Sequence, residues 1–303
     1  MKSDHLFDVI IIGGSYAGLS AAMSLGRSLR RVLIIDSGLP CNRQTPHSHN
    51  FLTQDGKTPE EIAEISKEQV AKYPTIRFYD GKAIDGRKTE VGFEISVADG
   101  EKFGAKKLIF ASGIKDIMQD IKGFSECWGI SVIHCPYCHG YEFRKEKTGI
   151  IANGDKAVHI ASLVSNLTED VSILTSGKAL FTTEQLAKLE RNKIPVIETE
   201  ITEIVHENGH LSSVIFKDGT TTDFTAVYAA IPFVQHSDIP EKLGCALTES
   251  GHLQTDVLQK TNIPGVFACG DSASMMRSVS NAVATGNIAG AMVNMELVNE
   301  KFG

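Results

Sequence analysis

One run near the N-terminus constrains the fold more than any other part of the sequence. Residues 8–12 (DVIII) are mostly apolar and β-branched, which predicts a short buried strand. A glycine-rich turn, GGSYAG, follows at residues 13–18, and residues 19–29 then have helical spacing and composition. Residues 31–35 predict a second buried strand, which ends at Asp36. This order of elements is typical of the βαβ unit of a dinucleotide-binding domain.

The glycine turn meets most of the requirements of a dinucleotide loop. Such a loop needs a tight turn, close approach of the backbone to the pyrophosphate, and close packing of helix on strand. Gly13 and Gly18 serve the first and third needs, and Ser15, which is small and can itself hydrogen-bond a phosphate, occupies the second position. Asp36 lies where ribose hydroxyls would bind. The alternatives are an ordinary strand–turn–helix and a solvated aspartate.

A second unit of the same kind follows in the middle of the chain. Residues 148–151 predict a strand, residues 152–157 a turn, residues 159–167 a helix and residues 171–174 another strand. A chain of 303 residues is long enough for two domains of ordinary size. The two units therefore indicate an internal structural repeat, with one unit in each domain.

Two further segments concern the organisation of the chain. Residues 107–114 (KLIFASGI) predict a buried strand that ends in a small-residue turn, which is a plausible domain boundary. The last predicted helix, residues 280–299, carries Ala282, Gly286 and Gly290 at four-residue spacing. Such a stripe of small residues lets a second helix or a ligand approach closely.

Composition excludes several classes of protein. The chain is 42% hydrophobic and 22% charged, and its net charge of −7 is spread without long runs of one sign. This pattern argues against nucleic-acid binding and against a polybasic membrane anchor. The N-terminus lacks the pattern of a signal peptide, and no stretch approaches the roughly 20 apolar residues of a membrane span. We therefore expect a cytoplasmic protein without membrane partners.

The stretch HCPYCH at residues 134–139 contains C-x-x-C-H, which fits a c-type haem, half of a zinc site or a redox-active dithiol. Haem is attached to this motif outside the cytosol, which weakens the first interpretation. A structural zinc needs four ligands, and no second C-x-x-C exists. A lone C-x-x-C in the reducing cytosol is more often catalytic. We expect a dithiol of Cys135 and Cys138 and no bound metal.

Four motifs in one order resemble those of the low-molecular-weight thioredoxin reductases. They are GGSYAG with Asp36, Ala111-Ser112-Gly113, the C-x-x-C after Trp128-Gly129, and TNIPGVFACGD at residues 261–271. The resemblance covers essentially the whole chain. It implies an α/β fold of two Rossmann-like, three-layer domains, the second inserted into the first, and a homodimer. Residues 1–115 plus 245–303 would bind FAD, and residues 116–244 would form an NAD(P)-binding-like domain that carries the C-x-x-C.

The resemblance also implies a set of FAD-binding residues at glycine turns, strand ends and the last helix. Asp271 would hydrogen-bond the ribityl chain of FAD, and the N-terminal amides of the following helix would face the flavin ring. The complete set is Gly13, Ser15, Tyr16, Ala17, Asp36, Ser37, Arg43, His49, Ala83, Ala111, Ser112, Gly113, Gly270, Asp271, Ser280, Asn281 and Ala282.

Three departures from the family pattern concern the nicotinamide. Ala152 replaces the first glycine of the second turn, Thr175-Ser176-Gly177 replaces the arginines that grip the 2′-phosphate of NADPH, and His139 replaces an aspartate. Lys178 alone cannot reproduce a bidentate arginine clamp. Lys156 could still attract a phosphate. NAD(P)H binding in the family manner is therefore doubtful.

With these departures the chain resembles a subset of the superfamily, the gliotoxin-type dithiol oxidases and their bacterial relatives. Members of this subset use FAD, oxidise a dithiol to a disulfide and pass the electrons to oxygen. Residues 43–56 (RQTPHSHNFLTQDG) also resemble the subset, which implies that Arg43 and His49 lie close to the flavin. For His47 we favour a solvated polar loop.

The chemistry of the C-x-x-C follows from its neighbours. A helix that begins at the motif, with Pro136 as its first residue, would lower the thiol pKa values. By resemblance, Cys138 faces the flavin, and Cys135, the more exposed, exchanges with the substrate. His139, a base of suitable strength, would carry the proton, although it could merely cap or pack. We expect Cys41, Cys127, Cys245 and Cys269 to be buried, and Tyr141 and Glu142 to serve packing and helix-start electrostatics.

The sequence therefore predicts an FAD-dependent thiol–disulfide oxidoreductase in which Cys135, Cys138 and His139 are catalytic. Oxygen or another non-nicotinamide molecule is the favoured electron acceptor, and the substrate is a small dithiol or disulfide or a thioredoxin-like protein. An NAD(P)H-dependent thioredoxin-disulfide reductase is the alternative enzyme. A flavin-bound redox sensor without turnover is the alternative from another class.

Overall fold

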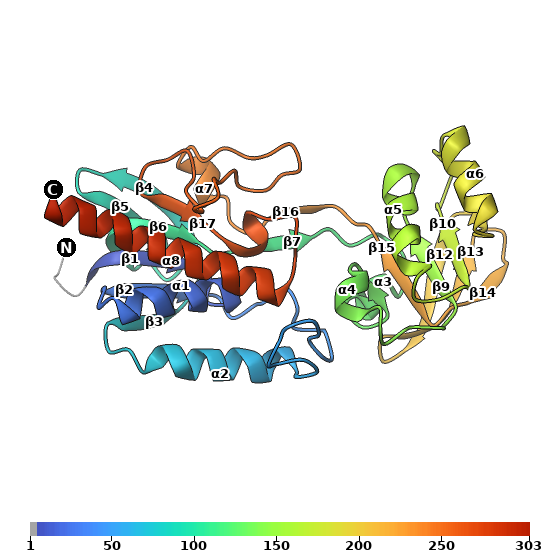
Figure 1. Ribbon diagram of the computed structural model, residues 1–303, viewed down its shortest axis with the longest axis horizontal. Helices are drawn as coiled ribbons and strands as arrows, with labels where there is room; N and C mark the ends of the chain where they lie inside the picture. Colours follow the sequence, from blue (N-terminus) through green and yellow to red (C-terminus); the bar gives the residue numbers. More distant parts are fainter. Residues whose placement is uncertain (1–4) are drawn as a thin grey trace. The chain divides into compact units, whose positions relative to one another are not determined.

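A computed structural model describes residues 5–303 of the chain. Backbone contacts divide it into two compact units (Figure 1). Unit 1 comprises residues 1–43, 51–115 and 233–303, and unit 2 comprises residues 44–50 and 116–232. The chain passes between them through a two-stranded sheet of β7 (Ile114–Asp116) and β16 (Phe233–Gln235). The second unit is thus inserted into the first.

Unit 1 is built on a sheet that is parallel at its centre. Its strands are β1 (Leu6–Ile12), β2 (Val32–Asp36), β3 (Ile76–Asp80), β4 (Ala83–Thr89), β5 (Gly92–Val97), β6 (Lys102–Phe110) and β17 (Val266–Ala268), in the order β3-β2-β1-β6-β5-β4. The first part of β6 pairs antiparallel with β5, and its last residues pair parallel with β17. All residues of β1 from Val9 to Ile12 are buried, as expected for a strand covered on both faces.

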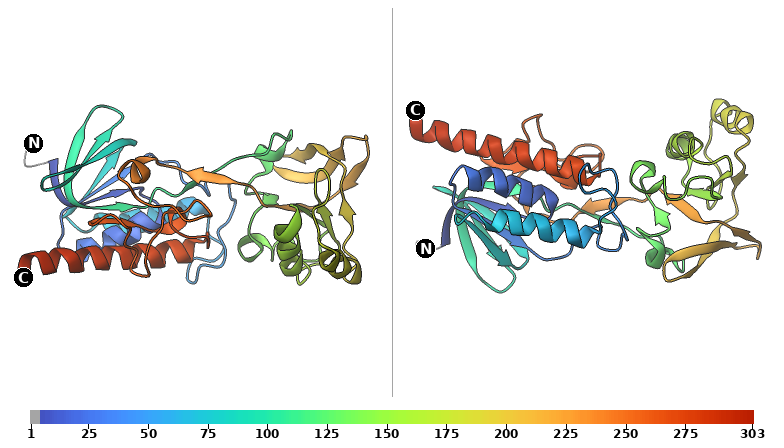
Figure 2. Two further views of the ribbon diagram at one scale, coloured as in Figure 1. Left: turned by 90° about the horizontal axis from the view of Figure 1, so that it is seen from above. Right: turned by 60° about the horizontal axis from the view of Figure 1, so that its bottom comes forward.

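Three helices cover one face of this sheet. They are α1 (Tyr16–Arg27), α2 (Pro59–Ala71) and α8 (Val279–Phe302), and they lie side by side (Figure 2). On the opposite face, residues of β1 and β2 share a hydrophobic cluster with the β4–β5 hairpin, which forms one end of the same sheet, and with the short helix α7 (Ile239–Lys242). A further 3-10 turn, η2 (Gly270–Ser272), follows β17. The two faces carry separate hydrophobic clusters, so unit 1 has three layers.

Unit 2 repeats the three-layer plan. Its parallel sheet has the order β11-β10-β9-β15-β8, with β8 (Val132–Ile133), β9 (Thr148–Ile151), β10 (Val171–Leu174), β11 (Val196–Ile197) and β15 (Ala226–Ala229). One face packs against α5 (Gly154–Val164) and α6 (Thr183–Arg191). The other packs against α3 (Phe124–Cys127) and an antiparallel sheet of β12 (Ile201–Glu207), β13 (His210–Phe216) and β14 (Thr221–Asp223). The one-turn helix α4 (Pro136–His139) follows β8.

Two expectations about domain boundaries need correction. Residues 233–244 belong to unit 1 and not to the inserted unit. The reason is burial: Ile239 of α7 is fully buried in the core of unit 1, against Gly86 of β4. Residues 44–50, expected in the first domain, belong to unit 2.

The small residues of α8 permit contact with a second helix. A side chain at Gly286 would place its Cβ 2.1 Å from the carbonyl oxygen of Ala17 in α1. At Gly290 the Cβ would lie 2.5 Å from the carbonyl oxygen of Ala21. The helix–helix alternative is therefore confirmed. Within residues 5–303, no helix combines the length and apolar character needed to cross a membrane.

Candidate functional site

The C-x-x-C lies at the start of α4, as the sequence predicts. Cys135 is the N-cap residue of this helix and Pro136 its first residue. The Sγ atoms of Cys135 and Cys138 are 2.9 Å apart, so a disulfide of about 2.05 Å requires only a small movement. Both side chains are half-buried. The helix has only four residues, so little dipole can accumulate along it.

His139 is half-buried directly after Cys138. Burial lowers the pKa of its imidazole below the usual value of 6.5; Glu142 opposes this change and His49 adds to it. Nε2 of His49 lies 3.5 Å from Oε1 of Glu142. From the sequence, Glu142 was expected only to serve packing and helix-start electrostatics, and nothing in the sequence pairs it with a residue so far away.

Tyr228 of β15 packs beneath the dithiol helix. Its side chain is fully buried, and its hydroxyl lies 2.8 Å from the position that a Cβ at Gly140 would take. Burial, Cys135 and Glu142 all raise the pKa of this phenol, so it stays protonated. Tyr141, expected to serve packing or helix-start electrostatics, is exposed and stacks on the guanidinium of Arg144, 4.0 Å from ring centroid to Cζ.

Three of the other four cysteines are buried, as expected. Burial raises the pKa values of Cys127 and Cys245, and raises that of Cys269 to about 12, so these thiols are unreactive. Cys41 contradicts the expectation. It lies in an exposed turn of unit 1, with its Sγ 3.9 Å from Oδ2 of Asp271, because the loop after β2 runs over the surface.

The first glycine turn has the geometry of a phosphate-binding loop. Gly13 has a left-handed φ of 106°, and a Cβ there would meet the carbonyl oxygen of Ala111 at 2.2 Å. A Cβ at Gly18 would lie 1.9 Å from the oxygen of Gly13. Ser15 is the N-cap residue of α1, and its hydroxyl makes no capping hydrogen bond. The first amides of α1 therefore remain available for a phosphate.

Two neighbouring segments complete this cradle. The side chain of Asp36 lies beside the turn, since a Cβ at Gly14 would be 2.8 Å from that of Asp36. The hydroxyl oxygen of Ser112 is buried and has no hydrogen-bond partner among the described residues. The amide nitrogen of Ser112 is 3.0 Å from the Cβ position of Gly13. An unsatisfied buried hydroxyl next to a glycine turn fits a polar ligand such as FAD.

The third part of the cradle lies at the start of α8. Gly270 has a φ of 71° and its Cβ position lies 2.9 Å from Ala17 of α1. The carboxylate of Asp271 lies 3.8 Å from Nε of Arg277. The side chain of Asn281 donates to the carbonyl oxygen of Met276, and this bond fixes the loop before α8. These segments are far apart in sequence and meet around the same turn.

The remaining residues expected at FAD occupy varied positions. Tyr16, Ala17, Ala83, Ala111 and Ala282 are buried, whereas Ser37, Arg43 and Ser280 are exposed. The hydroxyl of Tyr16 donates to the carbonyl oxygen of Pro59, so this side chain joins the core of unit 1. His49 belongs to unit 2.

Three basic residues that were not predicted, Lys82, Lys115 and His236, join the predicted residues Asp36 and Arg43. The pKa of His236 is lowered by burial and by the positive charges of Lys82, Lys115 and Arg43, while Asp36 raises it. These residues come from all three segments of unit 1. No local motif contains them, so only the fold could bring them together. Their positive charge suits a phosphate-containing cofactor.

The second glycine turn differs from the first because a side chain fills it. Oδ1 of Asn153 accepts hydrogen bonds from the amides of Gly154 (2.9 Å) and Leu180 (2.8 Å). Its Nδ2 donates to the carbonyl oxygen of Lys178 at 2.9 Å. Asn153 thus caps α5 and ties the loop after β10 across the start of this helix.

The loop after β10, where the family has arginines, is bonded instead to a carboxylate of the segment that follows β11. The side chain of Glu198 accepts a hydrogen bond from the amide of Ala179, and its backbone oxygen accepts one from Gly177 at 2.7 Å. Ser176 and Gly177 both have positive φ, of 49° and 136°. This tight turn presents negative charge, which disfavours a 2′-phosphate.

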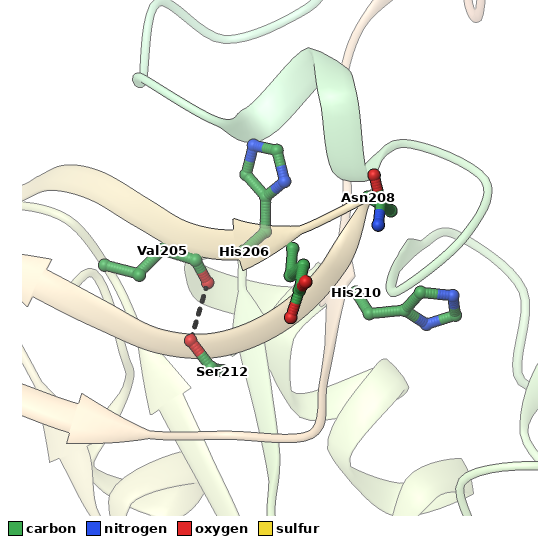
Figure 3. A pocket seen from close by; sticks show the side chains of 6 residues that line it. Val205, His206, Asn208, His210 and Ser212 are labelled. Carbon is green, nitrogen blue, oxygen red and sulfur yellow. Dashed lines mark hydrogen bonds between the residues drawn. The ribbon is translucent and has the colours of Figure 1, made fainter.

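A hollow on the β12–β13 hairpin is a separate feature of unit 2 (Figure 3). It is lined by Val205, His206, Glu207, Asn208, His210 and Ser212, none of which is a predicted site residue. The rings of His206 and His210 point in different directions (Figure 3). Nδ1 of His206 accepts a hydrogen bond from the amide of Gly209. The hollow is therefore a product of the hairpin turn.

Comparison with known proteins agrees with this geometry. Residues 7–286 match the family described as pyridine nucleotide-disulphide oxidoreductase. Thioredoxin reductase tcpT of Claviceps purpurea is 31% identical over 100% of this chain and 98% of its own length. The structure of an oxidoreductase from Agrobacterium tumefaciens is 39% identical, with a TM-score of 0.91 over 96% of this chain and 98% of that one.

A second structure extends the comparison to bacterial thioredoxin reductases. The thioredoxin reductase of Streptococcus pyogenes is 25% identical, with a TM-score of 0.90 over 98% of this chain and 100% of that one. The α/β fold of two Rossmann-like units is thereby confirmed. The chain belongs to the pyridine nucleotide-disulphide oxidoreductase family, as a thioredoxin reductase-like, FAD-dependent disulfide oxidoreductase.

Proposed function

We propose that this protein oxidises a dithiol substrate to a disulfide, without efficient use of NAD(P)H, and acts as a cytoplasmic homodimer. One observation carries the proposal: Asn153 occupies the helix start at which a nicotinamide dinucleotide would bind its pyrophosphate. The other helix start of this kind, at Ser15, has no such cap.

In the proposed reaction His139 takes the proton of a substrate thiol. The thiolate attacks Cys135 of the oxidised pair, the bond between Cys135 and Cys138 breaks, and Cys138 leaves as a thiolate. The second substrate thiol then attacks the mixed disulfide, which releases the substrate disulfide and leaves both enzyme cysteines reduced. FAD supplies the two-electron acceptor that restores the pair, with oxygen or another non-nicotinamide molecule as final acceptor.

Two contacts support the absence of a nicotinamide donor. A phosphate would have to displace the side chain of Asn153 from two backbone amides at once, and each such bond contributes about 1 kcal/mol. The carboxylate of Glu198 would repel a 2′-phosphate. Lys156 and Lys178 remain as cations of this region, and neither offers the fork of a guanidinium.

An anaerobic absorbance titration of the FAD-loaded protein tests the proposal. NADPH, NADH and a small dithiol are added in turn, followed by air. We expect the dithiol alone to bleach the flavin absorbance within the time of turnover, and air to restore it. Bleaching by NADPH at a catalytically useful rate would instead identify an NAD(P)H-dependent disulfide reductase.

Substitution of Cys135 separates an enzyme from a flavin-bound sensor. We expect Cys135→Ser to abolish dithiol turnover, measured as oxygen consumption, while the protein keeps its yellow colour. Cys245→Ala is the matched control, because this buried thiol lies outside the site and its loss costs stability of only about 1 kcal/mol. A wild-type protein that consumes no oxygen with any dithiol would favour the sensor.

A further inference from the structure

The last helix, α8, is apolar on two faces. One face packs against unit 1 through its buried residues, Ala282, Gly286, Ala289, Gly290, Val293 and Leu297. The helix lies on the outside of unit 1 (Figure 1), where a surface helix ordinarily presents charged and polar residues. Instead, exposed residues at alternating spacings of four and three are apolar as well. We call these six residues the outer stripe: Ala284, Ile288, Ala291, Met295, Val298 and Phe302.

The spacing of the outer stripe is typical of a helix that pairs with another helix. Ile288, Met295 and Phe302 are seven residues apart, and the other members lie three or four residues from them. Such a heptad pattern puts all of these side chains on one side of the helix. The four large side chains are between 36% (Ile288) and 94% (Phe302) exposed. Single exposed apolar residues are ordinary, but a continuous series of them marks an interaction surface.

The order of small and large residues in the outer stripe fits a second copy of the same helix. In an antiparallel pair centred on residue 293, every member of the stripe lies opposite another member. The pairs are Ala284 with Phe302, Ile288 with Val298, and Ala291 with Met295. Two of the three pairs combine a small with a large side chain, and the flexible Met295 can adapt to the residue that it meets. A two-fold symmetric interface requires this kind of self-complementarity.

Charge also favours a second copy over a charged partner. The acidic residues near the end of α8 turn back to unit 1, where Glu296 and Glu300 lie 2.9 and 2.6 Å from Nζ of Lys107. The residues on either side of the stripe, among them Asn287 and Asn294, are mostly uncharged. Copies of a chain with a net charge of −7 repel each other, so a contact between them needs a face without like charges. The outer stripe is such a face.

The apolar surface extends beyond α8, as a stable interface requires. A specific interface buries about 800 Å² per partner, and a stripe on one helix supplies only part of that area. Leu29, which follows α1, is 77% exposed. The next residue, Arg30, donates a hydrogen bond from Nε to Oδ1 of Asn294 at 2.7 Å, which places the end of α1 beside α8. Leu29 therefore adds apolar surface close to the stripe.

We propose that two copies of this chain associate through the outer stripe, with α8 packed antiparallel against α8 of the second copy. The two-fold axis lies at the level of residue 293. The Met295 residues of the two copies are then about four residues, or about 6 Å, apart along the helix axis. The inference rests on the homodimer of the proposed function and names its interface.

The test measures the mass of the FAD-loaded full chain by sedimentation at micromolar concentration. We expect the wild type to be a dimer. Met295→Glu brings two like charges together in an apolar contact, so we expect association to be about 100-fold weaker and the variant to be a monomer. Met295→Lys should behave in the same way. An equal mixture of the two variants should form a dimer again, because the opposite charges lie about one helical turn apart.

Val298→Glu and Val257→Glu form a matched pair of variants. Both valines are exposed, at 42% and 85%, but only Val298 belongs to the outer stripe. We expect Val298→Glu to be a monomer and Val257→Glu to remain a dimer. Flavin absorbance and circular dichroism show whether each variant is folded with its cofactor.

A dimeric wild type whose Met295→Glu and Val298→Glu variants stay dimeric would overturn the inference and leave the homodimer intact. A mixture of the two Met295 variants that stays monomeric would overturn the antiparallel pairing. A monomeric wild type would overturn the homodimer and its interface together. Failure of the proposed reaction is seen separately, as absence of oxygen consumption with a dithiol, because a protein that oxidises no dithiol can still form the dimer that these variants break.

Discussion

His139 lies in surroundings that make it a base at neutral pH. Burial disfavours the imidazolium, so the pKa lies below 6.5 and the neutral ring predominates near neutral pH. An aspartate at this position would be almost fully ionised and a much weaker proton acceptor. Histidine in place of the family's aspartate next to Cys138 therefore suits a reaction in which the incoming substrate is a thiol and must lose its proton.

A pH profile of His139→Asn tests this role. Because the folded pKa is lowered, the base form is fully present near neutral pH and is lost as pH falls through a value below 6.5. The wild-type exchange rate should fall over that window. In the variant we expect a rate about 100-fold lower at pH 7.5, and no acid limb in that window. Stopped-flow exchange with a small dithiol measures both.

Residues whose chemistry depends on sequence neighbours could be predicted. Cys135, Cys138 and His139 are adjacent in sequence, and the helix that begins at Pro136 has the expected start. Cys41 could not be placed, because its exposure depends on the course of a surface loop. The contact between His49 and Glu142 depends on a loop that crosses from one unit to the other, which no local pattern encodes.

At the scale of elements, the contact between α1 and α8 holds the cofactor cradle together. The helix α1 begins at the glycine turn, and α8 begins after Gly270 and Asp271. Gly286 and Gly290 allow the two backbones to approach closely. The hydroxyl of Ser20 in α1 also donates to the carbonyl oxygen of Val283 in α8, at 2.7 Å. The distance between these helices therefore fixes the distance between two parts of the cradle.

Gly286→Val should disrupt this contact. Its Cβ would lie 2.1 Å from the backbone oxygen of Ala17, so the helices must separate. We expect a loss of about 1–3 kcal/mol in unfolding free energy and a lower FAD content after purification. Ala291→Val, at an exposed position of the same helix, should cost only about 0.5 kcal/mol. Urea unfolding measures both, and equal losses would show that the close contact is unimportant.

Elements with a strong local pattern were predicted well. The strands β9 and β10 have the predicted ends, and β1 extends only to Leu6 beyond the prediction. The helix α5 begins at Gly154 and not at residue 159, since the side chain of Asn153 caps it early. The sheet β12-β13-β14 and the β4–β5 hairpin carry no motif and were not predicted.

For the whole molecule, the same βαβ plan occurs twice with opposite outcomes at the helix start. In unit 1 the N-cap residue Ser15 makes no side-chain bond, and the amides of α1 remain available. In unit 2 the side chain of the N-cap residue Asn153 accepts a hydrogen bond from the first amide of α5, that of Gly154, and also bonds the loop after β10. In the sequence, only Ala152 and Asn153 of the second turn indicate this difference. The hydrogen bonds of Asn153 to the loop after β10 involve residues about 25 positions away.

Hydrogen exchange on the full chain should detect the difference between the two units. Residues 13–18 should exchange about 100-fold more slowly in FAD-loaded protein, with free FAD at 100 times its Kd, than in FAD-depleted protein. NADPH added to the FAD-loaded protein should leave residues 152–157 unchanged, because the amide of Gly154 is already bonded to Asn153. The FAD comparison serves as the positive control. Protection of residues 152–157 by NADPH would show that Asn153 yields to a phosphate, and the protein would then have a functional nicotinamide site.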